Sequence, residues 1–172
     1  CGATSKDSQF AIKTVLSELL EKELIVILLG GDQSLVYGQH LAYEEKNKML
    51  NVVLVDEKFQ LKSEMDEIKV DNYIYNIFTH SPNILFNLSL LGYQSYLVDE
   101  ADLTLLKKMS FESYRLGRIK DDMKEVEPIV RDADLLAFNV GAMKFSDAPA
   151  VGDASPNGFY AEEACQIARY AG

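Results

Sequence analysis

Three polar clusters hold the side chains best suited to chemistry, and each follows directly on an apolar run. The clusters span residues 30–34 (Gly-Gly-Asp-Gln-Ser), 56–60 (Asp-Glu-Lys-Phe-Gln) and 138–142 (Phe-Asn-Val-Gly-Ala). A carboxylate such as that of Asp56 is able to ligate a metal ion, whereas the amides in the clusters are neutral hydrogen-bond partners. Together these residue types are those of a polar binding pocket or of a metal site.

The apolar runs in front of the clusters predict the strands that position them. They are residues 24–29, 51–56 and 133–140. Each run is short and apolar on both faces, which is typical of buried parallel strands. The double glycine of the first cluster allows the chain to turn sharply where the first strand ends. Because ligands bind beyond the carboxyl ends of parallel strands, we expect Gln33, Asp56 and Asn139 to converge in one crevice.

Helical segments alternate with these strands, which predicts a parallel sheet covered by helices on both faces. Helical spacing is found over residues 5–20, 34–45, 72–78, 101–109, 121–130 and 159–170. Further strands are expected at 84–91 and 94–98, and residues 113–119 are ambiguous. The predicted fold class is α/β, a three-layer α/β/α arrangement with a mainly parallel sheet, in a single domain over residues 1–172.

The order and spacing of the three clusters resemble the ureohydrolase superfamily, which includes arginase, agmatinase and formimidoylglutamase. That family has a Gly-Gly-Asp-His turn, then an Asp-Ala-His-x-Asp strand end, then a Ser-x-Asp-x-Asp strand end. An Ala-Pro element and a later Pro and Gly follow in a loop before a helix, as in residues 146–158 here. The resemblance covers about residues 24–172 and implies an arginase-like fold. Segments that flank this core in the family look absent, so we expect a fragment of a longer chain.

The resemblance also implies where a metal site would lie. Family members hold two Mn(II) ions with two His and four Asp side chains, and a bridging hydroxide attacks a guanidinium or formimino carbon. The turn Gly30-Gly31-Asp32 is kept in this sequence, and Asp56 matches one metal ligand. The other five ligand positions are occupied by Gln33, Lys58, Gln60, Asn139 and Gly141.

These replacements remove most of the negative charge that two dications require. Lys58 adds a positive charge instead, so we expect no bound manganese, no other cofactor and no catalysis. Since residues two apart on a strand point to one side, Lys58 is able to pair with Asp56 and fill the space of a metal ion. In the alternative, both side chains face solvent. His40 and His80 lie outside the motifs and are interpreted as surface residues or hydrogen-bonded core residues.

Three functions fit these residues. The first is a family member that has lost the dinuclear manganese site and serves as a non-catalytic binder, of a small molecule for example, or as an assembly subunit. The second is an active hydrolase of a formimino or guanidino C–N bond, similar to formimidoylglutamase, with a rebuilt site. The third is an unrelated doubly wound binding module. Metal content separates the first two, and strand connectivity tests the third.

The composition bears on partners and location. The chain has 172 residues, of which 48% are apolar, and a net charge of −10. Because no run is rich in Lys and Arg, nucleic-acid binding is not expected. No apolar run approaches the ~20 residues of a membrane span and no signal peptide is visible, so we expect a cytoplasmic protein without membrane partners. Family members are commonly oligomers, and we expect a homo-oligomer here.

Overall fold

The computed structural model of the protein describes residues 4–59, 61–62, 68–69, 72–152 and 155–171. Its contacts divide the chain into two compact units. The first unit comprises Cys1–Leu50 and Leu61–Phe86, and the second comprises Asn51–Gln60 and Asn87–Gly172. The prediction of a single domain stays a prediction.

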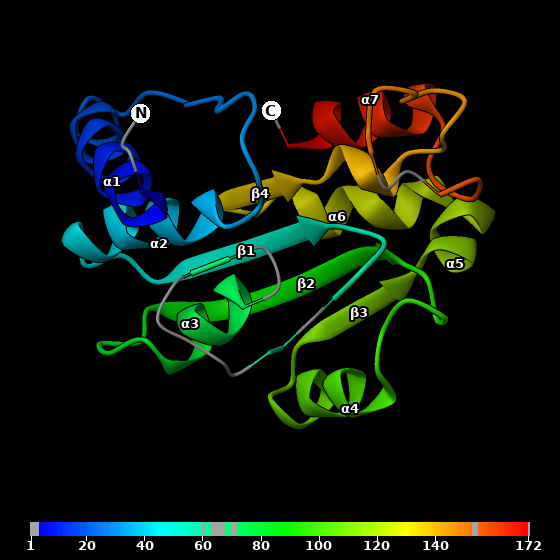
Figure 1. The fold of residues 1–172 in the computed structure, drawn as a ribbon, viewed down its shortest axis with the longest axis horizontal. Helices are drawn as coiled ribbons and strands as arrows, with labels where there is room; N and C mark the ends of the chain where they lie inside the picture. Colours follow the sequence, from blue (N-terminus) through cyan, green and yellow to red (C-terminus); the bar gives the residue numbers. More distant parts are fainter. Residues whose placement is uncertain (1–3, 60, 63–67, 70–71, 153–154, 172) are drawn as a thin grey trace. The chain divides into compact units, whose positions relative to one another are not determined.

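The first unit is helical and confirms three predicted helices. They are α1 (Ser5–Glu21), α2 (Leu35–Glu45) and α3 (Tyr73–Thr79), labelled in Figure 1. α1 begins at a capping box, in which the Thr4 and Asp7 side chains each accept a hydrogen bond from the other residue's backbone N–H group. α1 and α2 pack closely because Gly38 has no side chain. A Cβ atom at Gly38 would lie 2.9 Å from the carbonyl oxygen of Gln9.

Residues 24–29 do not form the predicted strand. They are an irregular segment between α1 and α2 (the blue trace in Figure 1), and residues 25–29 make no hydrogen bond within the described ranges. All of their side chains except that of Val26, which is half-buried, are exposed, with 86% of Ile25, 78% of Ile27 and 87% of Leu29 accessible to solvent. The prediction was wrong because apolarity reports only a tendency to be buried. A strand also needs a neighbouring strand whose backbone groups complete the ladder of hydrogen bonds.

The second unit is built on a four-stranded parallel sheet. Its strands are β1 (Leu50–Val55), β2 (Leu85–Tyr93), β3 (Glu112–Arg115) and β4 (Leu135–Phe138). Their order is β3-β2-β1-β4, and all four arrows point the same way (Figure 1). β1 and β4 are paired up to their last residues, Val55 and Phe138. The strands predicted at the positions of β1, β2 and β4 are therefore confirmed.

Two predictions for the second unit are corrected. Residues 94–98 form a turn rather than a strand, because Leu97 N donates to Gln94 O at 2.8 Å and closes the chain on itself. The helix predicted over 121–130 is interrupted. It consists of the end of α5 (Leu116–Asp121), a 3₁₀ turn, η1 (Met123–Glu125), and a short helix, α6 (Val126–Val130). Pro128 is tolerated because it lies in the first turn of α6, where a backbone N–H group has no helical partner.

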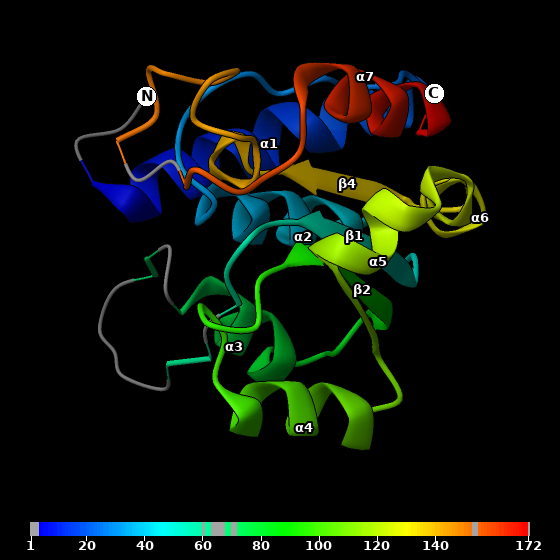
Figure 2. The same ribbon diagram turned by 90° about the vertical axis from the view of Figure 1, so that its right-hand side faces the viewer.

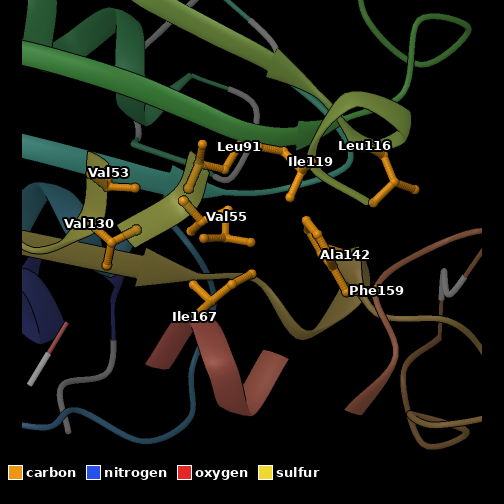
Figure 3. Packing of buried hydrophobic residues seen from close by; sticks show 10 residues of the cluster. Val53, Val55, Leu91, Leu116, Ile119, Val130, Ala142, Phe159 and Ile167 are labelled. Atoms are coloured by element: carbon orange, nitrogen blue, oxygen red, sulfur yellow. The ribbon is translucent and has the colours of Figure 1, made fainter. Parts of the chain in front are cut away.

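Helices α5 (Leu116–Asp121), α6 and α7 (Ala161–Tyr170) pack on one face of the sheet, and α5 and α6 lie together beside the strands (Figure 2). The shared core consists of Val53, Val55, Leu91, Leu116, Ile119, Val126, Val130, Ala142, Phe159 and Ile167 (Figure 3). Leu88 and Leu90 alternate with Leu91 along β2 and point to the opposite face. α4 (Glu100–Lys108) and α7 confirm two further predicted helices. No helix within the described ranges is both long and apolar enough to cross a membrane.

The loop in front of α7 is fastened to this core at Gly158 and Phe159. Phe159 is fully buried, and its backbone N donates to Ala142 O at 2.9 Å. A Cβ atom at Gly158 would lie 2.5 Å from the carbonyl carbon of Met143, so only glycine fits there without a backbone shift. Gly92, with φ of +87°, leaves room for the ring of Phe159, because a Cβ atom there would be 2.4 Å from that ring.

Candidate functional site

The carboxyl ends of β1 and β4 bring Asp56 and Asn139 together. The two strands are adjacent, and Asn139 N continues their pairing by donating to Val55 O at 2.9 Å. The side-chain amide of Asn139 then donates from Nδ2 to Asp56 Oδ2 at 2.9 Å. Two of the three residues that were predicted to share a crevice are thus in direct contact.

The other oxygen of the Asp56 carboxylate is also occupied. Oδ1 accepts a hydrogen bond of 3.1 Å from the backbone N of Lys58. Burial raises the pKa of Asp56 above its ordinary value, and the bonds from Asn139 and from the Lys58 backbone, with the Lys58 charge, oppose that rise. Asp56 is therefore a half-buried carboxylate whose charge is compensated by N–H donors and by a nearby ammonium.

The ammonium group of Lys58 lies beside Glu57, at 3.5 Å from its carboxylate. Glu57 is only 3% exposed, and its carboxylate also accepts from Gln94 Nε2 at 3.2 Å. Sequence reasoning missed Glu57. Side chains alternate along an extended chain, so Glu57 was expected to point away from Asp56, and the sequence does not show which residues bury its side chain. Whether Lys58 fills the position of a metal ion stays a prediction.

Asn139 also fixes the turn that follows it. Its Oδ1 accepts a hydrogen bond of 2.9 Å from Gly141 N, within the 3₁₀ turn η2 (Val140–Ala142). This bond sets the orientation of the amide, because the oxygen faces Gly141 and the nitrogen faces Asp56. A Cβ atom at Gly141 would lie 3.1 Å from the same oxygen, so the two residues form one tight unit.

Gln33 lies in the first unit, in the turn that leads into α2. Gly30 and Gly31 have φ of +92° and +82°, a conformation that favours glycine, which agrees with the turn predicted there. Asp32 Oδ1 accepts from Ser34 N at 2.8 Å and so stabilises the start of α2. That Gln33 shares the crevice of Asp56 stays a prediction, and Gln60 lies outside the described residues.

The two histidines outside the motifs form a cluster in the first unit. His80 Nδ1 lies 2.9 Å from the Tyr37 hydroxyl, and His80 Nε2 lies 2.9 Å from the Glu44 carboxylate. His40 is fully buried, with its ring stacked on Tyr37 at 6.1 Å and meeting the edge of His80 at 5.3 Å. Neither ring nitrogen of His40 has a hydrogen-bond partner among the described residues. The interpretation as a hydrogen-bonded histidine holds for His80 and is wrong for His40.

The pKa of His40 follows from this enclosure. Burial, and to a smaller extent the neighbouring His80, lower the pKa of His40 to about 4, although Glu44 opposes part of the fall. The ring is therefore neutral at pH 7. One signal in the sequence points to the cluster: Tyr37, His40 and Glu44 lie three and four residues apart, on one face of α2.

A sequence model of the arginase family matches residues 3–172, almost the whole chain. The chain belongs to the arginase family. This confirms the resemblance, and the parallel order of β1 and β4 agrees with the family's fold. No curated protein matches the chain.

Solved structures of similar proteins show the same arginase-like fold. Formimidoylglutamase from Bacillus subtilis gives a TM-score of 0.83 at 20% identity, covering 99% of this chain and 56% of that one. Trypanosoma cruzi formiminoglutamase with Mn²⁺ gives 0.86 at 13% identity, covering 97% and 59%. An arginase-like protein from T. brucei gives 0.75 at 17% identity, covering 97% and 52%. The chain thus spans just over half the length of these relatives.

Among the described residues at the family's ligand positions, Asp56 and Asn139 do not fit together as a pair of metal ligands. Both oxygens of Asp56 already accept hydrogen bonds, and Asn139 presents an N–H donor where a metal requires an oxygen ligand. In the part of the chain that the structure describes, no group of three His, Cys, Asp or Glu residues is placed to hold a metal ion.

Proposed function

We propose that this arginase-family domain has lost the dinuclear manganese site and catalysis, and serves as a non-catalytic binder or assembly subunit. The observation that carries the proposal is the pairing of Asp56 with Asn139. Where the family resemblance requires two carboxylates, an amide donates to the remaining carboxylate at 2.9 Å and neutralises no metal charge. The positive charge of two dications would not be compensated in such surroundings. The free-energy cost of that charge far exceeds the energy that the remaining ligands contribute.

The second candidate is an active hydrolase of a formimino or guanidino C–N bond with a rebuilt site. It is favoured by the structural similarity to formimidoylglutamase of B. subtilis and to the Mn²⁺-containing formiminoglutamase of T. cruzi. Such a site needs metal ligands other than those the family motifs supply. Metal content separates the two candidates directly.

Manganese binding is the first test. After dialysis against Mn(II) and removal of free metal, the chain is expected to retain well below one equivalent, because one carboxylate remains of six ligands. The measurement is metal analysis by plasma mass spectrometry, together with assays for hydrolysis of arginine, agmatine and formimidoylglutamate. Two equivalents of Mn(II) on the unmodified chain would contradict the proposal and establish the hydrolase.

A matched pair of variants sharpens the metal test. The first restores the ligands of the family motifs and consists of Gln33→His, Lys58→His, Gln60→Asp, Asn139→Asp and Gly141→Asp. It is expected to recover measurable Mn(II) affinity. The second is identical except that Lys58 is kept, and its ammonium group should prevent binding by repulsion. Circular dichroism is the check that both variants fold, and equal binding by the two would disprove the role given to Lys58.

Self-association is the second prediction and concerns the assembly role. The exposed apolar side chains of Ile25, Ile27, Leu28 and Leu29 favour association with a second copy. Ile27→Lys is expected to weaken association about tenfold or more, since burying one isoleucine contributes roughly 1.5–3 kcal/mol. Thr14→Lys is the control, because it adds the same charge at an exposed position of α1. Sedimentation velocity at micromolar concentration measures the effect, and a wild-type monomer would refute it.

A further inference from the structure

The sheet of the second unit ends in a strand that pairs on one side. Among the strands that the structure describes, β4 is the last in the order β3-β2-β1-β4 (Figure 1). Asp134 N, just before β4, donates to Asn51 O of β1 at 3.0 Å. Because successive residues of a strand face alternate sides, the backbone groups of Leu135 and Ala137 face away from β1. Neither residue makes a backbone hydrogen bond to a loop or helix in the described part of the chain.

This outer edge of β4 lacks the features that keep other edge strands from pairing. Natural edge strands are usually protected by charged side chains, by proline or by a bulge. β4 has the sequence Leu-Leu-Ala-Phe, and its register with β1 is continuous from Leu135 to Phe138. It therefore presents a regular apolar edge to which a further strand is able to add its backbone hydrogen bonds.

The first unit contains a segment that needs such an edge. Residues 25–29 read Ile-Val-Ile-Leu-Leu and make no hydrogen bond within the described ranges. β-Branched residues favour strands, and a short run with high strand propensity and neither charge nor proline is prone to pair with an exposed edge. The side chains of Ile25, Ile27 and Leu29 are at least 78% exposed. The segment thus has the sequence of a strand, and its backbone groups have no strand to pair with among the described residues.

The charge of the chain restricts where two copies are able to meet. Each chain carries a net charge of −10, so two copies repel each other over much of their surfaces. β4 and residues 25–29 contain no charged residue. Contact between these two stretches therefore places no like charges face to face, and it removes apolar side chains from water.

We propose that residues 25–29 of a second copy add to the outer edge of β4 as a fifth strand. The inference rests on the assembly role proposed above and names the surface that the second copy occupies. The added strand supplies hydrogen-bond partners for the backbone groups of Leu135 and Ala137, and β4 supplies them for the added strand. Each stretch thus provides what the other lacks.

Amide hydrogen exchange at low and high micromolar protein concentration tests the pairing. At high concentration the Leu135 and Ala137 amides are expected to exchange about tenfold more slowly or less, in step with the amides of residues 25–29. The Leu136 amide is the internal control, since it faces β1 and should be slow at both concentrations. Protection of residues 25–29 without any change at Leu135 and Ala137 overturns the pairing and leaves the assembly role standing. Protection that is independent of concentration also overturns it, because the partner is then not a second copy.

Proline variants separate backbone pairing from simple burial of apolar surface. Ile27→Pro and Leu28→Pro each remove one backbone donor, and their controls are Ile27→Ala and Leu28→Ala, which keep the donor and have less apolar surface than proline. Because alternate residues of the added strand face β4, at least one proline should weaken association tenfold or more relative to its alanine control. Sedimentation velocity is the measurement, with urea midpoints at low micromolar concentration as the check on folding. If both prolines associate as well as their alanine controls, the strand addition is refuted, whereas a wild-type monomer refutes the assembly role itself.

Discussion

Replacing Phe159 with alanine is expected to lower the free energy of unfolding by about 3–5 kcal/mol, the usual cost of deleting a buried aromatic ring. Phe159 has no exposed surface and lies among Val55, Leu91 and Ala142 in the core of the second unit (Figure 3). Gly92 makes room for the ring, so the neighbouring backbone is shaped around it and has little freedom to collapse into the space left. A urea titration followed by circular dichroism measures the loss.

Two further variants show whether burial is the cause. Phe159→Leu keeps most of the volume and should cost clearly less than Phe159→Ala. Phe86→Ala makes the same deletion at a side chain that is 71% exposed, and should change stability by no more than about 0.5 kcal/mol. Equal losses for Phe159→Ala and Phe86→Ala would contradict the packing described for the core.

Stability is expected to fall steeply between pH 6.5 and pH 4 because of His40. In the folded protein its pKa is about 4, whereas a free histidine titrates near 6.5. The unfolded chain therefore binds a proton that the folded chain rejects. The stabilisation that comes from keeping His40 neutral is fully present above pH 6.5. It is lost as the pH falls towards 4, and the free energy of unfolding then decreases by up to about 3 kcal/mol. The groups that face the ring are Tyr37, Glu44 and His80.

His40→Phe isolates this effect, because it keeps a ring stacked on Tyr37 and removes the titrating group. Its stability should vary much less between pH 6.5 and 4 than that of the wild type. At pH 7 it should be at least as stable, since two unpartnered buried nitrogens disappear. His80→Gln removes one of the causes that lower the pKa of His40, so its slope should be shallower than that of the wild type and steeper than that of His40→Phe. Urea midpoints at pH 7.5, 5.5 and 4.5 are the measurement, and parallel slopes for wild type and His40→Phe would refute the assignment.

The strands of the second unit could be predicted from sequence because their apolar runs pair with one another. The apolar runs that form β1 and β4 pair with each other in the sheet. Because the two strands are adjacent, Asp56 and Asn139 at their carboxyl ends meet. Residues 24–29 are more apolar than either and still form no strand, because pattern carries no information about a pairing partner. Apolar runs were buried as strands where a neighbouring strand completed the backbone hydrogen bonds. Where no such strand was present, the apolar run stayed exposed.

For the candidate site too, the sequence predicted some features and could not show others. Residue types at the strand ends were enough to expect a loss of negative charge around Asp56. The sequence could not show that the Asn139 amide is held in one orientation by Gly141, because that depends on the geometry of a 3₁₀ turn. Nor could it show that Glu57 and His40 are enclosed, since enclosure depends on segments distant in the chain.

The unpaired backbone of residues 25–29 has a consequence for hydrogen exchange and for proteolysis. Amide protons that make no hydrogen bond exchange with solvent at nearly the rate of a free peptide, whereas those of β1 require opening of the sheet. The same peptide bonds are accessible to a protease, and Leu28 and Leu29 suit enzymes that cut beside leucine. Association with a second copy would slow both processes together. Protection of these five amides, followed as the protein is diluted, therefore reports the assembly residue by residue.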